Sequence, residues 1–191
     1  MTMEKIFFAA DLHLGHRRIL EFKPGRPFAD RGDIDAHDEF VIGQWNDTIA
    51  PRDRVYILGD LCLKSVDGAR RLLERLNGRK YLVAGNHDSC LRGLGNYFVK
   101  VGQIMTLTVR RGNYPFLGSD REIVMCHYPL ADWPGRETGA INLHGHCHGS
   151  FDALNRESRQ RRFDVGYDSG LGRRCGGFVS LEAIEEILNI G

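Results

Sequence analysis

The chain has 191 residues and carries 26 lysines and arginines against 25 aspartates and glutamates, a formal net charge of +1. This length fits a single domain, residues 1–191, and the near-neutral charge excludes a global attraction to nucleic acid or anionic membranes. The five cysteines form no CxxC pair, which argues against a disulfide framework, and no apolar run approaches the ~18 residues of a membrane span. We therefore expect a soluble cytoplasmic protein with no membrane partner.

The first half of the sequence alternates between apolar strands and helices. Three short apolar runs, each followed by a Gly or Asp turn, predict buried strands at residues 6–10, 54–58 and 80–84. Between the first two strands, apolar residues at helical spacing predict a helix. It begins at the acidic residue Asp33 and ends before Pro51. Ser65 can cap a second helix that ends at Asn77-Gly78. The order of elements is β-α-β-α-β.

After residue 96 the pattern changes to short strands, followed by a last helix that Ser180 can cap. The predicted strands are residues 104–109, 122–126, 141–143, 162–166 and 178–181. Mixed strands with helices between them predict an α/β fold in which two mixed sheets pack together with helices outside.

Polar side chains follow the predicted strands at several places along the chain. They are Asp11 and His13, Asp60, Asn86 and His87, His127, and finally His146 and His148. Because sites in α/β sheets form beyond the carboxyl ends of the strands, we expect these side chains to converge. Side chains two apart on an extended chain point the same way, so each pair with that spacing can hold one ion.

The charges of this set favour two metal ions. Asp60 offers a carboxylate that can bridge two cations, and Asn86 offers a neutral carbonyl oxygen. Asp11 and Asp60 neutralise about half of the charge of two divalent ions, which leaves positive charge for a hydroxide and a phosphate ester. The sequence therefore predicts a binuclear metallohydrolase. A dinucleotide site is disfavoured, because no GxGxxG follows the first strand.

In this order the motifs DxH, GD, GNHD, a single His and GHxH resemble those of the calcineurin-like metallophosphoesterase superfamily, over residues 11–148. The resemblance implies a four-layer αββα sandwich, two mixed β-sheets flanked by helices. It also implies two divalent metal ions, with Mn favoured and Fe, Zn and Ni as alternatives. One ion would be bound by Asp11, His13, Asp60 and His148, and the other by Asp60, Asn86, His127 and His146. Asp60 would be the bridging ligand.

The same resemblance implies attack on phosphorus by a metal-bridging hydroxide, with Asp60 and His87 as the catalytic residues. His87 is not a ligand in the family pattern, so it can stabilise developing charge or protonate the leaving group. Some relatives carry a second acidic residue that orients this histidine, whereas this chain has Leu61-Cys62-Leu63. Asp88 is a candidate for that task.

Four residues are predicted to contact the substrate. His16 and Arg17 lie just beyond the first motif, where a helix would begin, and Asn86 lies beside the predicted catalytic histidine. Arg26 begins an RPF run which, with DLHLGH before it, is similar to a compact bacterial and phage branch of predicted phosphoesterases. An alternative is that this run only packs a loop.

We expect the protein to hydrolyse phosphodiesters, phosphomonoesters or both, acting on a nucleotide or another small phosphate ester. A small nuclease or nucleic-acid-end phosphatase is one alternative, and a non-catalytic metal-binding scaffold for a protein partner is another. The intact His87 favours the enzyme. A basic cluster at residues 156–162 and 173–174 is the one local hint of polyanion binding, but no aromatic residues interleave its arginines, so nucleic acid is not favoured. The sequence leaves the oligomeric state open.

Overall fold

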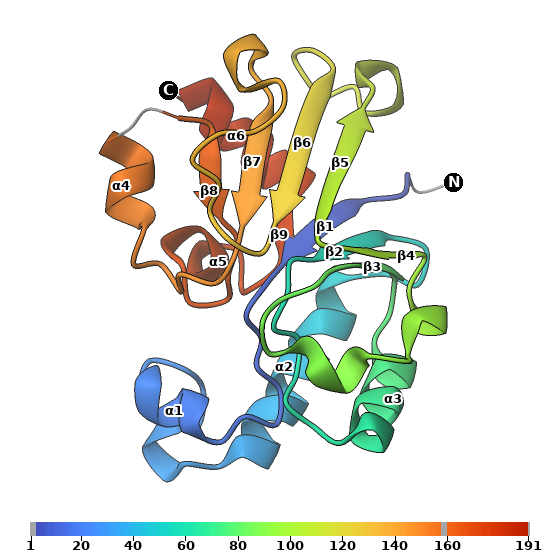
Figure 1. Cartoon of the computed structure of the whole chain (residues 1–191), viewed down its shortest axis with the longest axis vertical. Helices are drawn as coiled ribbons and strands as arrows, with labels where there is room; N and C mark the ends of the chain where they lie inside the picture. Colours follow the sequence, from blue (N-terminus) through green and yellow to red (C-terminus); the bar gives the residue numbers. More distant parts are fainter. Residues whose placement is uncertain (1–2, 158–159, 191) are drawn as a thin grey trace.

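The computed structural model describes residues 3–157 and 160–190 and arranges them as two mixed β-sheets with flanking helices (Figure 1). In the described part of the chain, the first sheet has the strand order β4-β3-β2-β1-β9 and the second β5-β6-β7-β8. Strand β9 is antiparallel to β1, and β5 is antiparallel to β6, whereas the other neighbours pair in parallel. The predicted pair of mixed sheets with flanking helices is confirmed.

The first sheet is built by the β-α-β-α-β segment and two added strands. Its strands are β1 (Ile6–Ala9), β2 (Arg54–Ile57), β3 (Arg79–Val83), β4 (Lys100–Gly102) and β9 (Val179–Ser180). Helices α2 (Ile34–Thr48) and α3 (Val66–Arg75) connect β1 to β2 and β2 to β3. The side chains of Asp33 and Ser65 cap them by accepting hydrogen bonds from the amides of Ala36 and Gly68, as the sequence predicted for Ser65.

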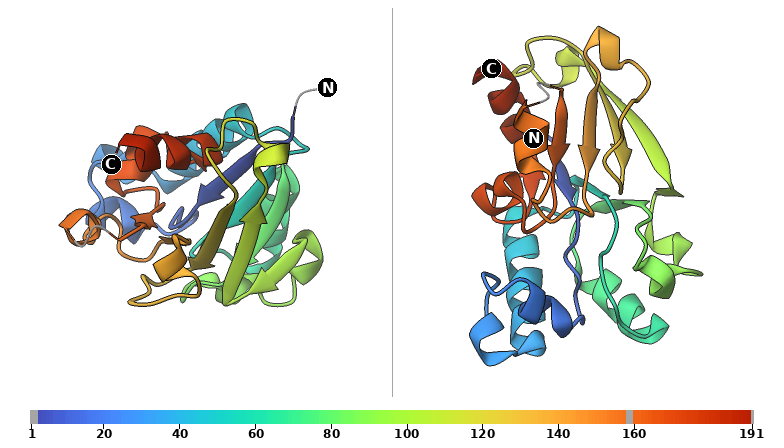
Figure 2. Two further views of the ribbon diagram at one scale, coloured as in Figure 1. Left: turned by 90° about the horizontal axis from the view of Figure 1, so that it is seen from above. Right: turned by 60° about the vertical axis from the view of Figure 1, so that its left-hand side comes forward.

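The second sheet consists of β5 (Ile104–Val109), β6 (Arg121–Cys126), β7 (Ile141–His144) and β8 (Arg162–Asp164). Helices α4 (Asp152–Glu157) and α5 (Gly170–Arg174) contact β8, and α6 (Leu181–Ile190) contacts β1 and β9 (Figure 2). Ser180 caps α6, as predicted, by accepting the Ala183 amide at 3.1 Å. Helix α1 (Arg18–Phe22) follows β1, and the short 3-10 helices are Ala29–Arg31, Asp88–Leu91, Gly95–Tyr97, Arg111–Asn113 and Arg136–Thr138. None of the described helices is long and apolar enough to cross a membrane.

Strand β1 separates two apolar cores. Phe7 and Ala9 belong to the core that the first sheet shares with Trp45 of α2, whereas Ile6 and Phe8 belong to the core between the two sheets. This division follows from the alternation of side chains along a strand, and all these side chains are at most 4% exposed. Burying each of the larger ones stabilises the fold by roughly 1.5–3 kcal/mol.

Backbone hydrogen bonds join the loops that follow these strands. The amides of Asp11 and His13 donate to the carbonyls of Gly59 and Asp60, each at 3.0 Å, and the Gly145 amide donates to the carbonyl of His127, also at 3.0 Å. The loop after β1 is thereby held to the loop after β2, and the loop after β6 to the loop after β7; the amide of His146, which donates to the carboxylate of Asp11, joins the two pairs. The side chains that these loops carry are brought together by these hydrogen bonds.

Candidate metal centre

The side chains predicted to bind metal converge where the loops meet. The Nε2 atom of His13 lies 3.2 Å from Nε2 of His148 and 3.7 Å from Oδ2 of Asp60. The Nε2 atom of His127 lies 3.6 Å from the same Asp60 oxygen and 3.0 Å from Oδ1 of Asn86. One carboxylate oxygen of Asp60 therefore lies between imidazoles of both predicted metal sites, which is the position of a bridging ligand.

Two groups of donor atoms are compact enough to hold an ion, with all atoms of a group within 4.8 Å of one another: Asp11, His13 and His148, and Asp11, Asp60 and His127. Asp11 belongs to both groups, so both carboxylates lie between the two sites. His146 is in neither group, although its ring centroid lies 5.1 Å from that of His127. Its backbone amide donates to both carboxylate oxygens of Asp11, at 3.1 and 2.9 Å.

The hydrogen bonds of two imidazoles test whether this site suits a metal. Nδ1 of His127 lies 2.8 Å from the Leu58 carbonyl, and Nδ1 of His148 lies 2.8 Å from a carboxylate oxygen of Asp168. Because these partners can only accept, each Nδ1 must carry the proton, and in the neutral ring each Nε2 presents a lone pair to the centre. Nε2 of His127 then faces the Asn86 oxygen, a second acceptor. Acceptors that face one another fit a shared cation, so the residues present suit divalent metal ions.

Burial shifts the pKa values of two candidate ligands, His13 and Asp11. Burial, with smaller effects of His148 and Arg26, lowers the pKa of His13 to about 2, so this imidazole is neutral near pH 7. Burial also raises the pKa of Asp11 well above its usual value, and the carboxylates of Asp164 and Asp60 raise it further. A divalent cation would relieve this crowding of buried carboxylates.

Five of the candidate ligands have left-handed backbone conformations. Their φ angles are +57° for Asp11, +53° for His13, +55° for Asp60, +68° for His146 and +47° for His148. Residues with a Cβ avoid this region, and each such residue costs about 1–3 kcal/mol. The hydrogen bonds between the loops hold the ligands in this conformation. Gly145 has a related constraint, because a Cβ there would lie 2.8 Å from Oδ2 of Asp11.

Arg26 lies behind the metal centre. It is 4% exposed, and its guanidinium donates to both carboxylate oxygens of Asp168, to the Leu12 carbonyl at 2.7 Å and to the Asp11 carbonyl at 2.6 Å. The sequence predicts that Arg26 contacts the substrate. The structure instead shows its donors bonded to the protein, because the RPF run folds the side chain under the loop that carries Asp11. Asp168, held by Arg26, in turn accepts a hydrogen bond from the ring of His148.

Sequence reasoning missed two carboxylates that hold the loop of His148. Burial would raise the pKa of Asp168, but the hydrogen bonds from His148 and Arg26 outweigh burial and hold that pKa below its usual range. Asp164 accepts the amides of Gly149 and Gly166 at 2.9 and 2.8 Å. Both aspartates lie at or just after the end of β8, so the signal that identified Asp11 and Asp60, an acidic residue leaving a strand, was present.

The candidate catalytic histidine lies on the exposed side of the centre. The ring centroid of His87 lies 5.5 Å from that of His13, and its backbone amide donates to Oδ1 of Asp60 at 2.8 Å. The suggestion that Asp88 orients the His87 ring is wrong, because the oxygens of Asp88 accept the amides of Asp60, Leu61 and Gly85. Asp88 instead shapes the loops that carry Asp60 and Asn86.

Other residues form the rim of the centre. The ring centroid of His16 lies 5.5 Å from that of His13, whereas Arg17 is exposed at the start of the five-residue helix α1. Tyr128, 44% exposed, lies with its ring centroid 4.6 Å from that of His146 and its hydroxyl 3.5 Å from the Asn86 oxygen. The structure thus places His16, Asn86 and Tyr128 around the exposed side.

Comparisons with known proteins identify the family of this chain. The profile of the family described as Calcineurin-like phosphoesterase matches residues 4–168. The gene 66 protein of Mycobacterium phage L5 is 29% identical over 98% of this chain and 95% of its own length. An uncharacterized protein of Methanocaldococcus jannaschii is 31% identical over 78% of this chain and 72% of its own.

The fold also has a counterpart among solved structures. A protein of unknown function from Aquifex aeolicus covers 96% of this chain and 99% of its own, with a TM-score of 0.71 and 20% sequence identity. At this identity the likeness concerns the fold alone. The family profile spans the ordered motifs from the first strand to the loop after β8, and on that ground the chain belongs to the calcineurin-like phosphoesterase family.

Proposed function

We propose that this chain is a binuclear metal-dependent phosphoesterase that hydrolyses phosphodiesters, phosphomonoesters or both. The observation that carries the proposal is the pair of imidazoles, His127 and His148, whose Nε2 lone pairs face one centre together with the carboxylates of Asp11 and Asp60. Mn is the favoured metal, and Fe, Zn and Ni are alternatives. When bound, the ions would polarise the phosphate ester and make water more acidic.

The two sets of ligands are those that the motifs predict. Asp11, His13, Asp60 and His148 would hold one ion, and Asp60, Asn86, His127 and His146 the other. The neutral state of His13 supports this assignment, since a protonated imidazole cannot bind metal. Asp60 has two tasks, because Oδ2 lies near His13 and His127 while Oδ1 accepts the amide of His87.

His87 would supply the proton chemistry. Its exposed ring lies beside the centre, which supports a role in donating a proton to the leaving oxygen or in stabilising charge that develops there. His16, Arg17 and Asn86 would contact the ester. Arg26 would support the loops rather than the substrate. The exposure of Asn86, His87 and Tyr128 suits a small phosphate ester such as a nucleotide.

Steady-state hydrolysis tests the proposal. Metal-stripped protein would be assayed with p-nitrophenyl phosphate and bis-p-nitrophenyl phosphate before and after addition of Mn, and metal content would be measured by elemental analysis. We expect Mn to restore turnover. His87→Ala should keep both metals and lose at least ~100-fold in turnover, the scale of general acid catalysis. Asp60→Asn should lose both metal and activity.

The outcomes separate the alternatives. Metal loss in His87→Ala, or full activity in that variant, would contradict the role of His87. If the wild type binds two metals but hydrolyses neither ester, this would contradict hydrolysis of simple esters and favour a metal-binding scaffold. A preference for the diester or the monoester would define the class of natural substrate.

A further inference from the structure

The basic cluster noted in the sequence divides into separate groups in the structure. Arg162 is 7% exposed, and its guanidinium donates to Oδ1 of Asn155 and to the Leu130 carbonyl, so it serves the fold. Arg156 of α4 and Arg174 of α5, in contrast, have no hydrogen bond or ion pair with another described residue. Both side chains line one cavity. The cavity is also lined by Arg162 and by the carboxylates of Asp152 and Asp164, so its three arginines outnumber its two carboxylates and favour an anion at Arg156 and Arg174.

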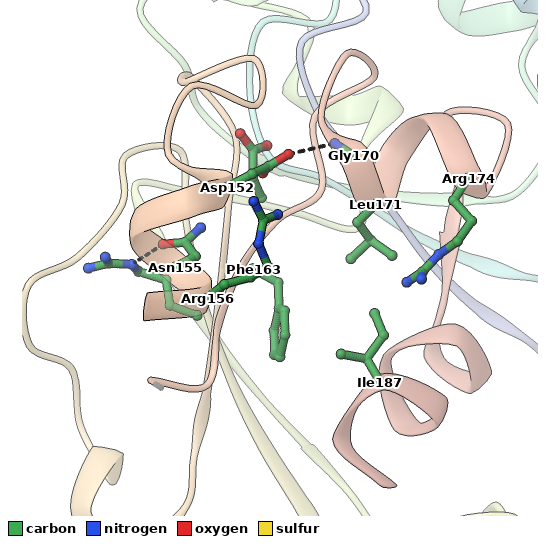
Figure 3. Close-up of a pocket in the computed structure, with 10 residues that line it drawn as sticks. Asp152, Asn155, Arg156, Phe163, Gly170, Leu171, Arg174 and Ile187 are labelled. Carbon is green, nitrogen blue, oxygen red and sulfur yellow. Dashed lines mark hydrogen bonds between the residues drawn. The ribbon is translucent and has the colours of Figure 1, made fainter. Parts of the chain in front are cut away.

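This cavity has the size of a small-ligand site. Its volume is about 430 Å³, and it is bounded by α4, β8, α5 and α6. Binding sites for small molecules commonly measure roughly 300–1,000 Å³. In Figure 3, Asp152 and Asn155 lie on the α4 side, Leu171 and Arg174 lie on the opposite side, and Phe163 lies between them.

The lining combines three kinds of chemistry. Phe163, Leu171 and Ile187 offer apolar surface, including one partly exposed aromatic ring. Arg156 and Arg174 offer guanidinium groups, which match the geometry of a phosphate. Asp152 uses one oxygen to accept the Gly170 amide at 2.7 Å, which leaves its other oxygen free to accept a hydrogen bond from a ligand.

We propose that this cavity is a second ligand site, which binds a nucleoside monophosphate with its phosphate at Arg156 and Arg174 and its base against Phe163. A nucleotide matches all three features of the lining: a flat ring, an anion, and a base amino group that can donate to Asp152. A free phosphate would leave the apolar surface unused. The site goes beyond the proposed catalytic function, because none of its lining residues is a candidate metal ligand or substrate contact.

The cavity borders the elements that support His148. Ser169 caps α5 by accepting the Gly172 amide at 2.8 Å, and the preceding residue, Asp168, accepts the hydrogen bond from His148. Asp164 lines the cavity and also accepts the amide of Gly149. A nucleotide in the cavity would therefore contact the same elements that hold the His148 loop.

Isothermal titration of adenosine monophosphate into metal-stripped protein tests the proposal, because without metal the catalytic centre lacks the two ions proposed to bind the phosphate. We expect the variant Arg156→Ala/Arg174→Ala to bind at least tenfold more weakly than the wild type. The matched control is Arg52→Ala/Arg71→Ala, which removes two exposed arginines that have no bonded partner among the described residues. This control should bind like the wild type.

Two further measurements complete the test. Adenosine and inorganic phosphate, titrated separately, should each bind more weakly than the nucleotide, since each fills only part of the cavity. Amide chemical shifts recorded during the titration should change at Gly170 and Leu171. Equal affinity of the wild type and the Arg156/Arg174 variant would overturn the proposal, as would phosphate that binds as tightly as the nucleotide, or shift changes confined to the loops of the metal centre.

Discussion

At the scale of single residues, the candidate metal centre depends on hydrogen bonds that lie behind the candidate ligands. The Leu58 carbonyl and the Asp168 carboxylate hold the Nδ1 protons of His127 and His148, and this leaves their Nε2 atoms free to bind metal. Arg26 then fixes Asp168 from the far side. The ligand atoms are therefore oriented before any ion arrives.

This arrangement predicts the effect of Asp168→Asn. The variant removes the charged acceptor of the His148 proton, so the ring loses its fixed tautomer, and we expect Mn affinity to fall by ~10–100-fold. Arg26 would also lose its buried counter-charge, which should cost about 3–5 kcal/mol of stability. Isothermal titration with Mn and urea unfolding measure the two effects separately.

A matched control exists on the other side of the molecule. Glu185 is 3% exposed and accepts two hydrogen bonds from the guanidinium of Arg121, but it contacts no metal ligand. Glu185→Gln should lower stability and leave Mn affinity unchanged. Loss of Mn affinity in this control, or unchanged affinity in Asp168→Asn, would show that Asp168 does not position His148.

The convergence of the candidate ligands could be predicted from the sequence, but the contact between Arg26 and Asp168 that supports His148 could not. The ligands stand in short motifs directly after apolar strands, and the structure brings the predicted set together. The support of His148 joins Arg26 to Asp168, which are 142 residues apart in the sequence. Neither residue lies in a metal-binding motif, so only the fold shows that they are in contact.

At the scale of elements, the sequence did not predict three secondary-structure elements, and all three are short. Strand β4 and helices α4 and α5 have three, six and five residues. Helical periodicity is visible over roughly 11 or more residues and strand alternation over about four or more, so α4, α5 and β4 are each too short to show their pattern. They are held instead by tertiary contacts, of which the link between β7 and α4 is an example.

That link predicts a pH dependence of stability. His144 of β7 donates from Nδ1 to the Gly145 carbonyl, and its Nε2 accepts a hydrogen bond from Asn155 of α4 at 3.1 Å. Burial lowers the pKa of His144 to about 4, from about 6.5 in the unfolded chain. Between pH 6.5 and 4 the unfolded state takes up a proton that the folded state does not, so this residue makes stability fall as the pH falls, by about 3 kcal/mol in total.

Urea unfolding of metal-stripped wild type and His144→Gln at pH 7 and pH 4.5 measures this effect. The variant should be less stable at pH 7 but should lose less stability on acidification, since glutamine does not titrate. The other titratable groups are common to both proteins and cancel in the comparison. Parallel losses of stability in the two proteins would contradict the assignment to His144.

At the scale of the whole molecule, the metal centre draws on both sheets. Loops of the first sheet carry Asp11, His13, Asp60 and Asn86, and loops of the second carry His127, His146 and His148. An ion bound there connects the two halves of the fold, and the unfolded chain has no such site. Metal binding should therefore stabilise the whole protein.

Thermal unfolding with and without Mn checks this expectation. At a free Mn concentration 100 times the dissociation constant, linkage predicts about 2.7 kcal/mol of added stability and a higher Tm. Asp60→Asn should show a smaller increase at the same concentration, because the carboxylate between the two sites is gone. An identical Tm with and without Mn in the wild type would contradict a native metal centre.

The left-handed backbone of five ligands has a consequence for how this protein tolerates mutation. At these positions the residue that binds metal best is not the residue that the backbone conformation favours, because glycine would adopt the same φ without strain. Replacing His146 by glycine should therefore remove a ligand and still make the metal-free protein harder to unfold. Selection for stability alone would favour glycine at these positions, so the candidate ligands are retained only where selection acts on what their side chains do.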